Sequence, residues 1–207
     1  NKARERPVDW DAMTPARLRE QANIGTSMFG GSAVGGVRIE RVYYRNDPIL
    51  TMASPMVPPS DFSFSKCVMK AGMIWDEVEA AGLSGVTGVW CHEPGGARML
   101  NVIAIKQAYP GHARQAGMLA ASCQSGSYLG RFVIVVDDDI DPTNLWEVMW
   151  SMCTRCDPAE DIDFIRRAWS GPLDPRLDRA SSTNSRAVIV ATRPFERIGG
   201  FPPVARA

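Results

Sequence analysis

The spacing of apolar residues predicts alternating strands and helices over most of the chain. Five consecutive apolar positions lie within residues 131–139, and such a run is typical of a strand that is covered on both faces. Apolar runs at 85–93 and 98–106 predict two paired strands joined by a Pro-Gly-Gly turn, and 187–192 predicts a late strand. Strands that alternate with helices indicate an α/β layer around a parallel or mixed sheet.

Helical segments are predicted between these strands. Two short helices are expected to end at Gly72 and Gly82. Pro110 opens a further helix with small residues on one face, and residues 144–155 have the apolar spacing of a helix that packs on a core. A last short helix is expected at 158–169.

The first part of the chain has a different pattern. Residues 14–36 predict a short helix followed by a glycine-rich link with no charge. Alternating positions at 37–45 and a short run at 49–52 predict two strands. Residues 53–61 contain three prolines and no periodic pattern, which indicates a domain boundary at this place.

Composition and charge exclude several classes of protein. The 207 residues include 23 basic and 23 acidic side chains, so the formal net charge is zero. The overall charge therefore does not attract nucleic acid or an anionic membrane. No apolar run is long enough to span a membrane, and the five cysteines form no regular framework, so we expect a cytoplasmic protein. The chain starts without a methionine, which indicates a piece of a longer polypeptide.

An acidic cluster follows the most apolar strand. Asp137, Asp138 and Asp139 lie where α/β sheets place ligand crevices, and they could hold Mg²⁺ or polarise a water. Because adjacent side chains of a strand point to opposite faces, the three carboxylates cannot all reach one ion. Asp141 is placed to cap the following helix. A structural role is therefore favoured over metal binding.

Cysteine and histidine residues also suggest chemistry. Cys153 and Cys156 have the spacing of half a zinc site or a redox pair, but no second pair completes it, so buried thiols are favoured. Cys91 and His92 could form a nucleophile and its base, but on a strand they would face opposite sides. His112 lies in the first turn of a predicted helix, which favours its neutral form.

Seven segments in series resemble the latter half of UbiD-type carboxy-lyases. They span about residues 41–194 and read RVYYRNDPIL, GVTGVWCHEPGG, IKQAYPGH, RFVIVVDDDIDP, TRCDP, GPLDP and VIVATRP. Members of this family (de)carboxylate aromatic and α,β-unsaturated acids with prenylated FMN, Mn²⁺ and K⁺. The resemblance implies the end of a split flavin-binding β-barrel over residues 1–52, a boundary at 53–61 and a carboxy-terminal α/β domain over 62–207.

The resemblance also implies which residues line the substrate cavity. They come from three segments: Thr87, Cys91, Ser127, Tyr128, Gly171 and Leu173. Gln124 stands where some members carry a lysine near the flavin phosphate, which weakens its assignment to the cofactor. The Glu-Arg-Glu network and the metal ligands of the family are not found, and no carboxylate occurs between Glu20 and Glu40.

The function implied by the resemblance is non-oxidative decarboxylation of an aromatic carboxylate. The flavin would supply the electron sink when CO₂ leaves, and this chain would roof the substrate cavity. These residues alone are expected to be inactive and to need the remaining portion of the same enzyme. Because members of the family commonly form homo-oligomers, the resemblance implies such an assembly as well. The alternative is a non-catalytic scaffold or assembly subunit that has kept the fold and lost the acid and the cofactor.

Overall fold

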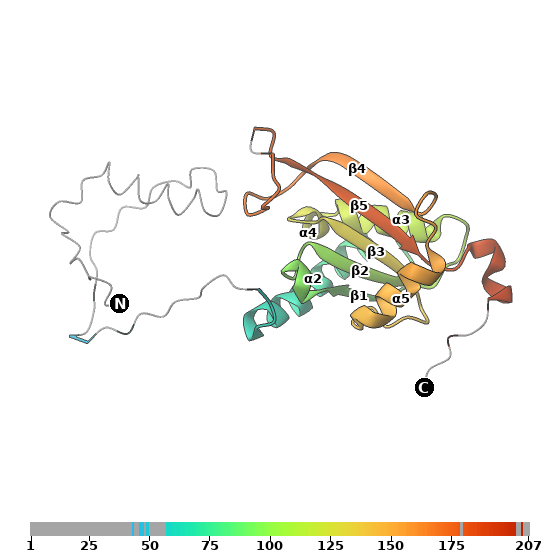
Figure 1. Cartoon of the computed structure of the whole chain (residues 1–207), viewed down its shortest axis with the longest axis horizontal. Helices are drawn as coiled ribbons and strands as arrows, with labels where there is room; N and C mark the ends of the chain where they lie inside the picture. The colour runs from blue at the N-terminus through green and yellow to red at the C-terminus, as the bar shows by residue number, and fades with distance from the viewer. Residues whose placement is uncertain are drawn as a thin grey trace.

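The described residues form one five-stranded mixed sheet with helices on both faces (Figure 1). The computed structural model describes residues 43, 46, 47, 49, 57–178, 180–201 and 204. The strands are β1 (Val86–Cys91), β2 (Leu100–Ile105), β3 (Phe132–Asp137), β4 (Ile162–Trp169) and β5 (Thr183–Ala191). The helices are α2 (Asp61–Ala80), α3 (His112–Ser122), α4 (Gln124–Ser127) and α5 (Leu145–Arg155), with 3₁₀ turns η1 (Glu93–Gly95) and η2 (Phe195–Gly200). The predicted α/β layer is confirmed.

Three parallel strands make the centre of the sheet. The order is β1-β2-β3-β5-β4, in which β2, β3 and β5 are parallel and the two edge strands are antiparallel to their neighbours. Parallel neighbours require crossover connections, and α3 and α5 lie in these connections. The amino ends of the three central strands therefore meet at one end of the sheet and their carboxyl ends at the other.

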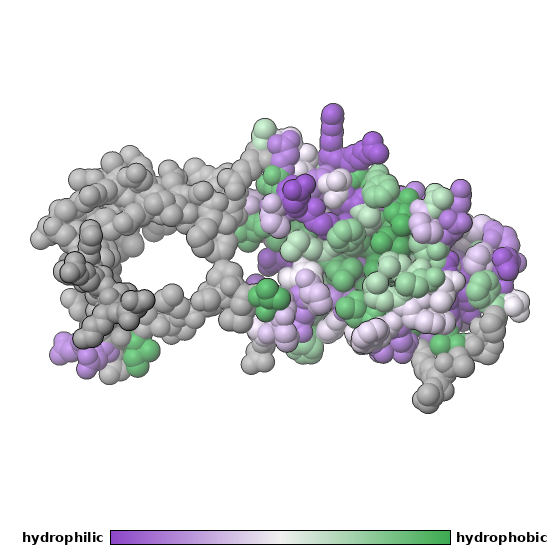
Figure 2. Space-filling view, in the orientation of Figure 1, coloured by the Kyte–Doolittle hydropathy of each residue, from purple (hydrophilic) through white to green (hydrophobic). Residues whose placement is uncertain are grey.

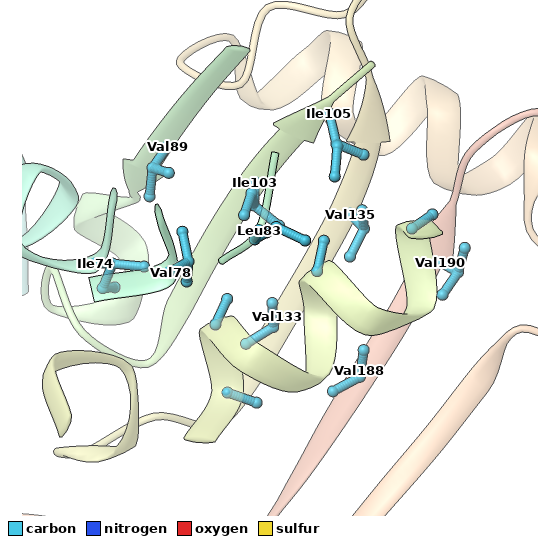
Figure 3. Close-up of a cluster of buried hydrophobic side chains, with 14 of the residues drawn as sticks. Ile74, Val78, Leu83, Val89, Ile103, Ile105, Val133, Val135, Val188 and Val190 are labelled. Atoms are coloured by element: carbon cyan, nitrogen blue, oxygen red, sulfur yellow. The ribbon is translucent and has the colours of Figure 1, made fainter. Parts of the chain in front are cut away.

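The apolar run of β3 is buried on both faces, as predicted. Val133 and Val135 pack against α3 in the larger core, which also contains residues of α2 and which Figure 3 shows. Ile134 and Val136 point to the opposite face and pack near α5. The first residue of the run, Phe132, is 45% exposed, because it lies at the end of the strand beyond the covering helices.

Small residues let α3 approach the sheet closely. A methyl group at Gly117 would overlap Val188 Cγ1 and would lie 2.9 Å from Val135 Cγ2, which is closer than packed atoms tolerate. The small face predicted for this helix is therefore the face that meets β3 and β5.

The variant Gly117→Ala is expected to lower the free energy of unfolding by about 1–3 kcal/mol, because the added methyl overpacks the contact between α3 and the sheet. Urea unfolding of the 207-residue chain measures this loss. The matched control is Gly72→Ala in α2, where nothing lies within 4 Å of an added methyl. The control should be neutral or gain about 0.5–1 kcal/mol. Equal stability of Gly117→Ala and the parent chain would contradict the contact.

One continuous helix replaces the two that were predicted before β1. α2 runs through Gly72, so the prediction that this glycine ends a helix is wrong. Buried residues recur along one side of α2 on both sides of the glycine, at Cys67, Ala71, Ile74 and Val78, and their packing outweighs the helix propensity of one glycine. Beyond the helix end Gly82 has a φ of +89°, which agrees with the predicted stop.

The predicted helix at 158–169 is wrong. Residues 158–160 form a turn, and from Ile162 the segment is β4, which pairs antiparallel with β5. Ile165 packs against the core that contains α3. Pairing with a neighbouring strand therefore overrides the local helical pattern. The late strand also begins earlier than predicted, at Thr183 instead of 187.

The acidic cluster after β3 forms ion pairs. Asp137 is buried, and its Oδ2 accepts hydrogen bonds from Arg155 Nη1 and from the backbone N–H of Arg193, both at 2.7 Å. Arg155 also donates to both carboxylate oxygens of Asp139, at 2.9 and 2.8 Å. Burial alone would raise the pKa of Asp139, but the hydrogen bonds and charge of Arg155 hold that pKa below its usual value. This network joins β3, α5 and the end of β5.

The helix after this cluster is capped by Asn144, so the prediction that Asp141 caps it is wrong. The Asn144 side chain accepts from the N–H of Trp146 at 3.1 Å. Asp141 instead accepts from the N–H of Thr143 at 2.9 Å and shapes the turn that precedes the cap. The capping residue is therefore the polar side chain directly before α5.

The predictions for the first part of the chain fall almost wholly outside the described residues. These predictions are the helix and glycine-rich link at 14–36 and the strands at 37–45 and 49–52. The barrel remnant over 1–52 stays a prediction for the same reason. Part of the proline-rich segment is described, and Ser60 at its end caps α2. No helix among the described residues combines the length and apolar composition needed to cross a membrane.

Candidate functional site

Tyr128 lies at the amino end of the central strands, between α4 and β3. Its ring packs directly on the backbone of Gly171, where an added Cβ would overlap Tyr128 Cε2 and would lie 2.7 Å from Cδ2. The ring of Trp169, the last residue of β4, is tilted towards it with the ring centroids 6.2 Å apart. Only glycine at position 171 lets the Tyr128 ring occupy this place.

Two cationic side chains converge on the Tyr128 ring. Lys70 Nζ lies 5.6 Å from the ring centroid and Arg98 Cζ lies 5.4 Å from it, within the range of cation–π contacts. Lys70 reaches this point from the inner side of α2, and Arg98 comes from the loop between η1 and β2. None of the ion pairs among the described side chains joins Lys70 or Arg98 to a carboxylate.

The environment of Lys70 is electrostatically unfavourable for a cation. Lys70 is buried, and its Nζ makes one long hydrogen bond, 3.4 Å to the carbonyl oxygen of Tyr128. Burial first, and then the positive charge of Arg98, lower the pKa of Lys70 below its ordinary value. The charge of Glu77 acts in the opposite sense, but that carboxylate is already hydrogen-bonded to Ser125. A carboxylate bound beside both cations would add the negative charge that offsets burial and the mutual repulsion of the cations.

A buried arginine fixes the backbone around Tyr128. The guanidinium of Arg186, on β5, donates to the carbonyl oxygens of Ala121, Ser127 and Trp169. These three carbonyls belong to the end of α3, to α4 and to β4, so one side chain ties together the segments that carry Tyr128 and Gly171.

A carboxylate holds α4 from the other side. Glu77 on α2 accepts a hydrogen bond from the backbone N–H of Ser125 at 2.9 Å and a second from its hydroxyl. Burial alone would raise the pKa of Glu77, but the hydrogen bonds from Ser125 and Cys123 and the charge of Lys70 hold that pKa below its usual value. The Glu77 carboxylate therefore stays charged and anchors the segment that precedes Tyr128.

The structure brings some of the cavity residues predicted from the sequence together. Tyr128 and Gly171 are in contact, and the backbone of Ser127 is held beside them by Arg186. Leu173 follows two residues after Gly171 and is 46% exposed. Gln124 begins α4, and its side chain is exposed. These residues occupy one end of the sheet.

Thr87 lies far from Tyr128, whereas Cys91 lies at the same end of the sheet but inside the core, where it pairs with Asn101 and interacts electrostatically with Lys70. Thr87 is exposed near the start of β1, beside the carboxyl ends of the parallel strands, and so at the opposite end from Tyr128. Cys91 is fully buried in the core beneath α2, and burial raises the pKa of its thiol to about 12. Neither side chain contributes to the surface around the Tyr128 ring.

Lys70 and Arg98 are not among the site residues predicted from the sequence, but one of them carries a signal. Lys70 lies on the side of α2 that buries Cys67 and Ile74, where a buried lysine is unusual and indicates a functional contact. Arg98 follows a Pro-Gly-Gly turn, and nothing in its local pattern distinguishes it from a surface residue.

The other candidate groups have structural partners or lie apart. His92 Nε2 is 3.0 Å from the carbonyl oxygen of Pro142, as expected of a histidine that faces a turn. His112 is buried and its Nδ1 accepts from a backbone N–H, while burial lowers its pKa, so the neutral form is confirmed. The expected burial is wrong for Cys153, which is exposed because it lies on the side of α5 away from Val148. Cys156 is half-buried.

A family model matches most of the domain built above. The model of the 3-octaprenyl-4-hydroxybenzoate carboxy-lyase carboxy-terminal domain matches residues 64–191. The chain belongs to this UbiD family. The match covers nearly all of α2 and all five strands, and it includes Lys70, Arg98, Tyr128 and Gly171. The resemblance seen in the sequence is therefore confirmed.

Curated relatives of this UbiD-family chain are decarboxylases. It is 28% identical over 165 residues to the phenolic acid decarboxylase of Bacillus subtilis, a match that covers 80% of this chain and 34% of the relative. It is 26% identical over 160 residues to the phenolic acid decarboxylase of Sedimentibacter hydroxybenzoicus, covering 76% and 32%. The chain thus spans about a third of the length of these relatives.

Solved structures share the fold. A UbiD-class enzyme from Pelotomaculum thermopropionicum in complex with FMN has a TM-score of 0.60 and 26% identity, covering 67% of this chain and 30% of that one. The apo 3,4-dihydroxybenzoic acid decarboxylase of Klebsiella pneumoniae has a TM-score of 0.61 and 24% identity, covering 70% and 31%. The mixed sheet and its helices are therefore those of the UbiD class.

Proposed function

We propose that this domain forms the roof of the substrate cavity in a UbiD-type enzyme that (de)carboxylates an aromatic or α,β-unsaturated acid on prenylated FMN. The observation that carries the proposal is the convergence of Lys70 and Arg98 on the Tyr128 ring. Two cations beside an aromatic ring match the two parts of an aromatic carboxylate, its charge and its flat apolar face. The names of the curated relatives, phenolic acid decarboxylases, support the same class of substrate.

Each residue has a distinct task in this proposal. Arg98 and Lys70 bind the carboxylate, and Tyr128 and Trp169 pack against the ring of the acid. Gly171 leaves the space in which Tyr128 lies. Together these groups orient the acid and exclude water from the bond that breaks.

The cofactor supplies the electron sink for the departing CO₂. Among the described residues no three histidine, cysteine or acidic side chains cluster as metal ligands, so Mn²⁺ and K⁺ would be bound by other residues of the enzyme. Gln124 is exposed and neutral, and it can offer a hydrogen bond to the flavin phosphate but no charge. The remaining portion of the same enzyme would therefore hold the cofactor.

Several further expectations from the sequence belong to the proposal. Leu173 and Ser127 would extend the cavity wall from the same end of the sheet, whereas Thr87 would need a partner surface at the opposite end. Assembly into a homo-oligomer and a cytoplasmic location are also proposed. One solved UbiD-class structure is an evolved dimeric form, which agrees with assembly in that enzyme.

The test uses the full-length enzyme that contains this domain, loaded with prenylated FMN, and measures CO₂ release from a panel of phenolic acids. Lys70→Met and Arg98→Met are each expected to raise KM about tenfold or more, because each removes a charge-assisted hydrogen bond to the carboxylate. The matched control is Lys106→Met, an exposed lysine in the same domain, which should leave KM unchanged.

Two results would count against the proposal. An unchanged KM in both variants would show that the two cations do not bind the carboxylate. Failure of the full-length protein to retain flavin absorbance or release CO₂ would favour the alternative, a non-catalytic scaffold or assembly subunit with the same fold.

A further inference from the structure

A second cationic surface lies on the hairpin of β4 and β5, outside the Tyr128 site. A cavity of about 510 Å³ is lined by Phe164, Arg166, Arg167, Arg176, Thr183, Asn184 and Ser185. Three of these residues are arginines, whose side chains end in guanidinium groups, and none is acidic. Hydrophilic residues gather along the upper edge of the molecule in Figure 2, over β4 and the loops that join it to β5.

A β-bulge gives two neighbouring arginines to the same cavity. Ile165 pairs with Arg186 and Ala168 pairs with Asn184, so Arg166 and Arg167 together face a single residue of β5, Ser185. In a regular strand, adjacent side chains point to opposite faces, but a bulge redirects one of them. Both arginines consequently line the cavity.

The backbone of the bulge is unusual for the residue that it carries. Arg167 has a φ of +54°, in the left-handed region that residues other than glycine adopt rarely and at a cost. Glycine would adopt this φ without steric cost, so the backbone conformation does not explain why the residue is an arginine. Costly backbone of this kind is concentrated at ligand sites.

The third arginine is held in place by a buried acid. The Asp174 carboxylate accepts from the backbone N–H of Arg176 at 2.9 Å and from Asn184 Nδ2 at 2.7 Å, and it is paired with Arg131. The Asp174 charge is therefore already balanced. No described ion pair joins a carboxylate to the guanidinium of Arg166, Arg167 or Arg176.

We propose that this hairpin cavity binds a phosphate ester that carries an aromatic ring, such as a nucleoside monophosphate. Three guanidinium groups suit a phosphoryl group, which has two negative charges and three acceptor oxygens. The hydroxyl of Ser185 adds a hydrogen-bond donor, whereas the Thr183 hydroxyl donates to Ser181, which itself donates to Asp178. Phe164 is 65% exposed at the cavity, and its ring offers a surface on which a base stacks.

The test is calorimetric titration of the 207-residue chain with AMP, inorganic phosphate and adenosine at low ionic strength. AMP is expected to bind saturably below about 1 mM, more tightly than phosphate, and to weaken as salt is added. Adenosine should not bind measurably, because it lacks the charged group. Decarboxylation is not measured, so the outcome is independent of the function proposed for the Tyr128 site.

Variants separate the roles of the charge and the ring. Arg167→Gly keeps the left-handed backbone without strain, so the chain should fold, and it should weaken AMP binding about tenfold, as should Arg176→Met. Phe164→Ala should weaken AMP about fivefold and leave phosphate binding unchanged. Arg197→Met, an exposed arginine remote from the cavity in the sequence, is the control and should bind AMP normally.

Three results would overturn the proposal. They are the absence of saturable AMP binding at about 1 mM, AMP binding that the arginine variants leave unchanged, and binding of adenosine or benzoate as tight as that of AMP. Tight benzoate binding would assign the cavity to aromatic carboxylates instead of phosphate esters.

Discussion

Arg186→Met is expected to lower the free energy of unfolding by about 3–5 kcal/mol. Methionine keeps much of the apolar bulk, but it removes the donors to the carbonyl oxygens of Ala121, Ser127 and Trp169. Buried acceptors without donors cost about 1–3 kcal/mol each, and three of them lie in one place. Urea unfolding of the 207-residue chain measures the loss.

Two further variants make this prediction specific. Arg186→Lys keeps the charge, but its ammonium group cannot reach three carbonyls in different directions. Its loss in free energy of unfolding should therefore exceed half of the loss for Arg186→Met. Arg197→Met, at an exposed position, should change stability by less than about 0.5 kcal/mol. A loss below about 1 kcal/mol for Arg186→Met would mean that water or backbone movement replaces the guanidinium.

Gly171→Val in the full-length enzyme is expected to lower kcat/KM about 100-fold, because a displacement of the binding surface by about 1 Å can have an effect of that size. The first atom of any side chain at this position would overlap the Tyr128 ring, whose Cδ2 is 2.7 Å from the ideal Cβ. The ring must then leave its place beside Lys70 and Arg98. Steady-state kinetics with the best phenolic acid of the panel measures the effect.

Gly199→Ala is the matched control for this variant. Nothing lies within 4 Å of an added methyl at Gly199, so kinetics and stability should both stay near those of the parent enzyme. A thermal melt of Gly171→Val separates a lost fold from a lost site. Normal kcat/KM in a folded Gly171→Val enzyme would place the Tyr128 ring outside the substrate cavity.

Local patterns predict the centre of the fold better than its edge. The run from Phe132 to Val136 by itself predicts a central strand, since consecutive apolar residues in a strand indicate that both faces are buried. β4 has no comparable run, and Ile165 is its main contribution to the core. The strand forms because β5 pairs with it as the second strand of a hairpin, and the pairing overrides the helical pattern of the segment itself.

The candidate site is predictable from the sequence only in part. Tyr128 and Gly171 follow from the family resemblance, and their direct contact follows from the missing side chain at Gly171. The pattern along α2 marks Lys70 as unusual but not its contact with Tyr128, and nothing marks Arg98, because both come from segments before β2 and reach Tyr128 only after the chain has folded. Their role depends on distance in space, which the spacing of residues along one helix or loop does not encode.

The ion pairs of Asp137 and the aromatic cluster around Tyr128 occupy opposite ends of the same three parallel strands. If the proposed function holds, substitutions at an exposed position such as Leu173 can consequently alter ring preference while the ion pairs at the far end keep the layers together. Divergent enzymes with new specificities can arise from this scaffold without a matching loss of heat resistance.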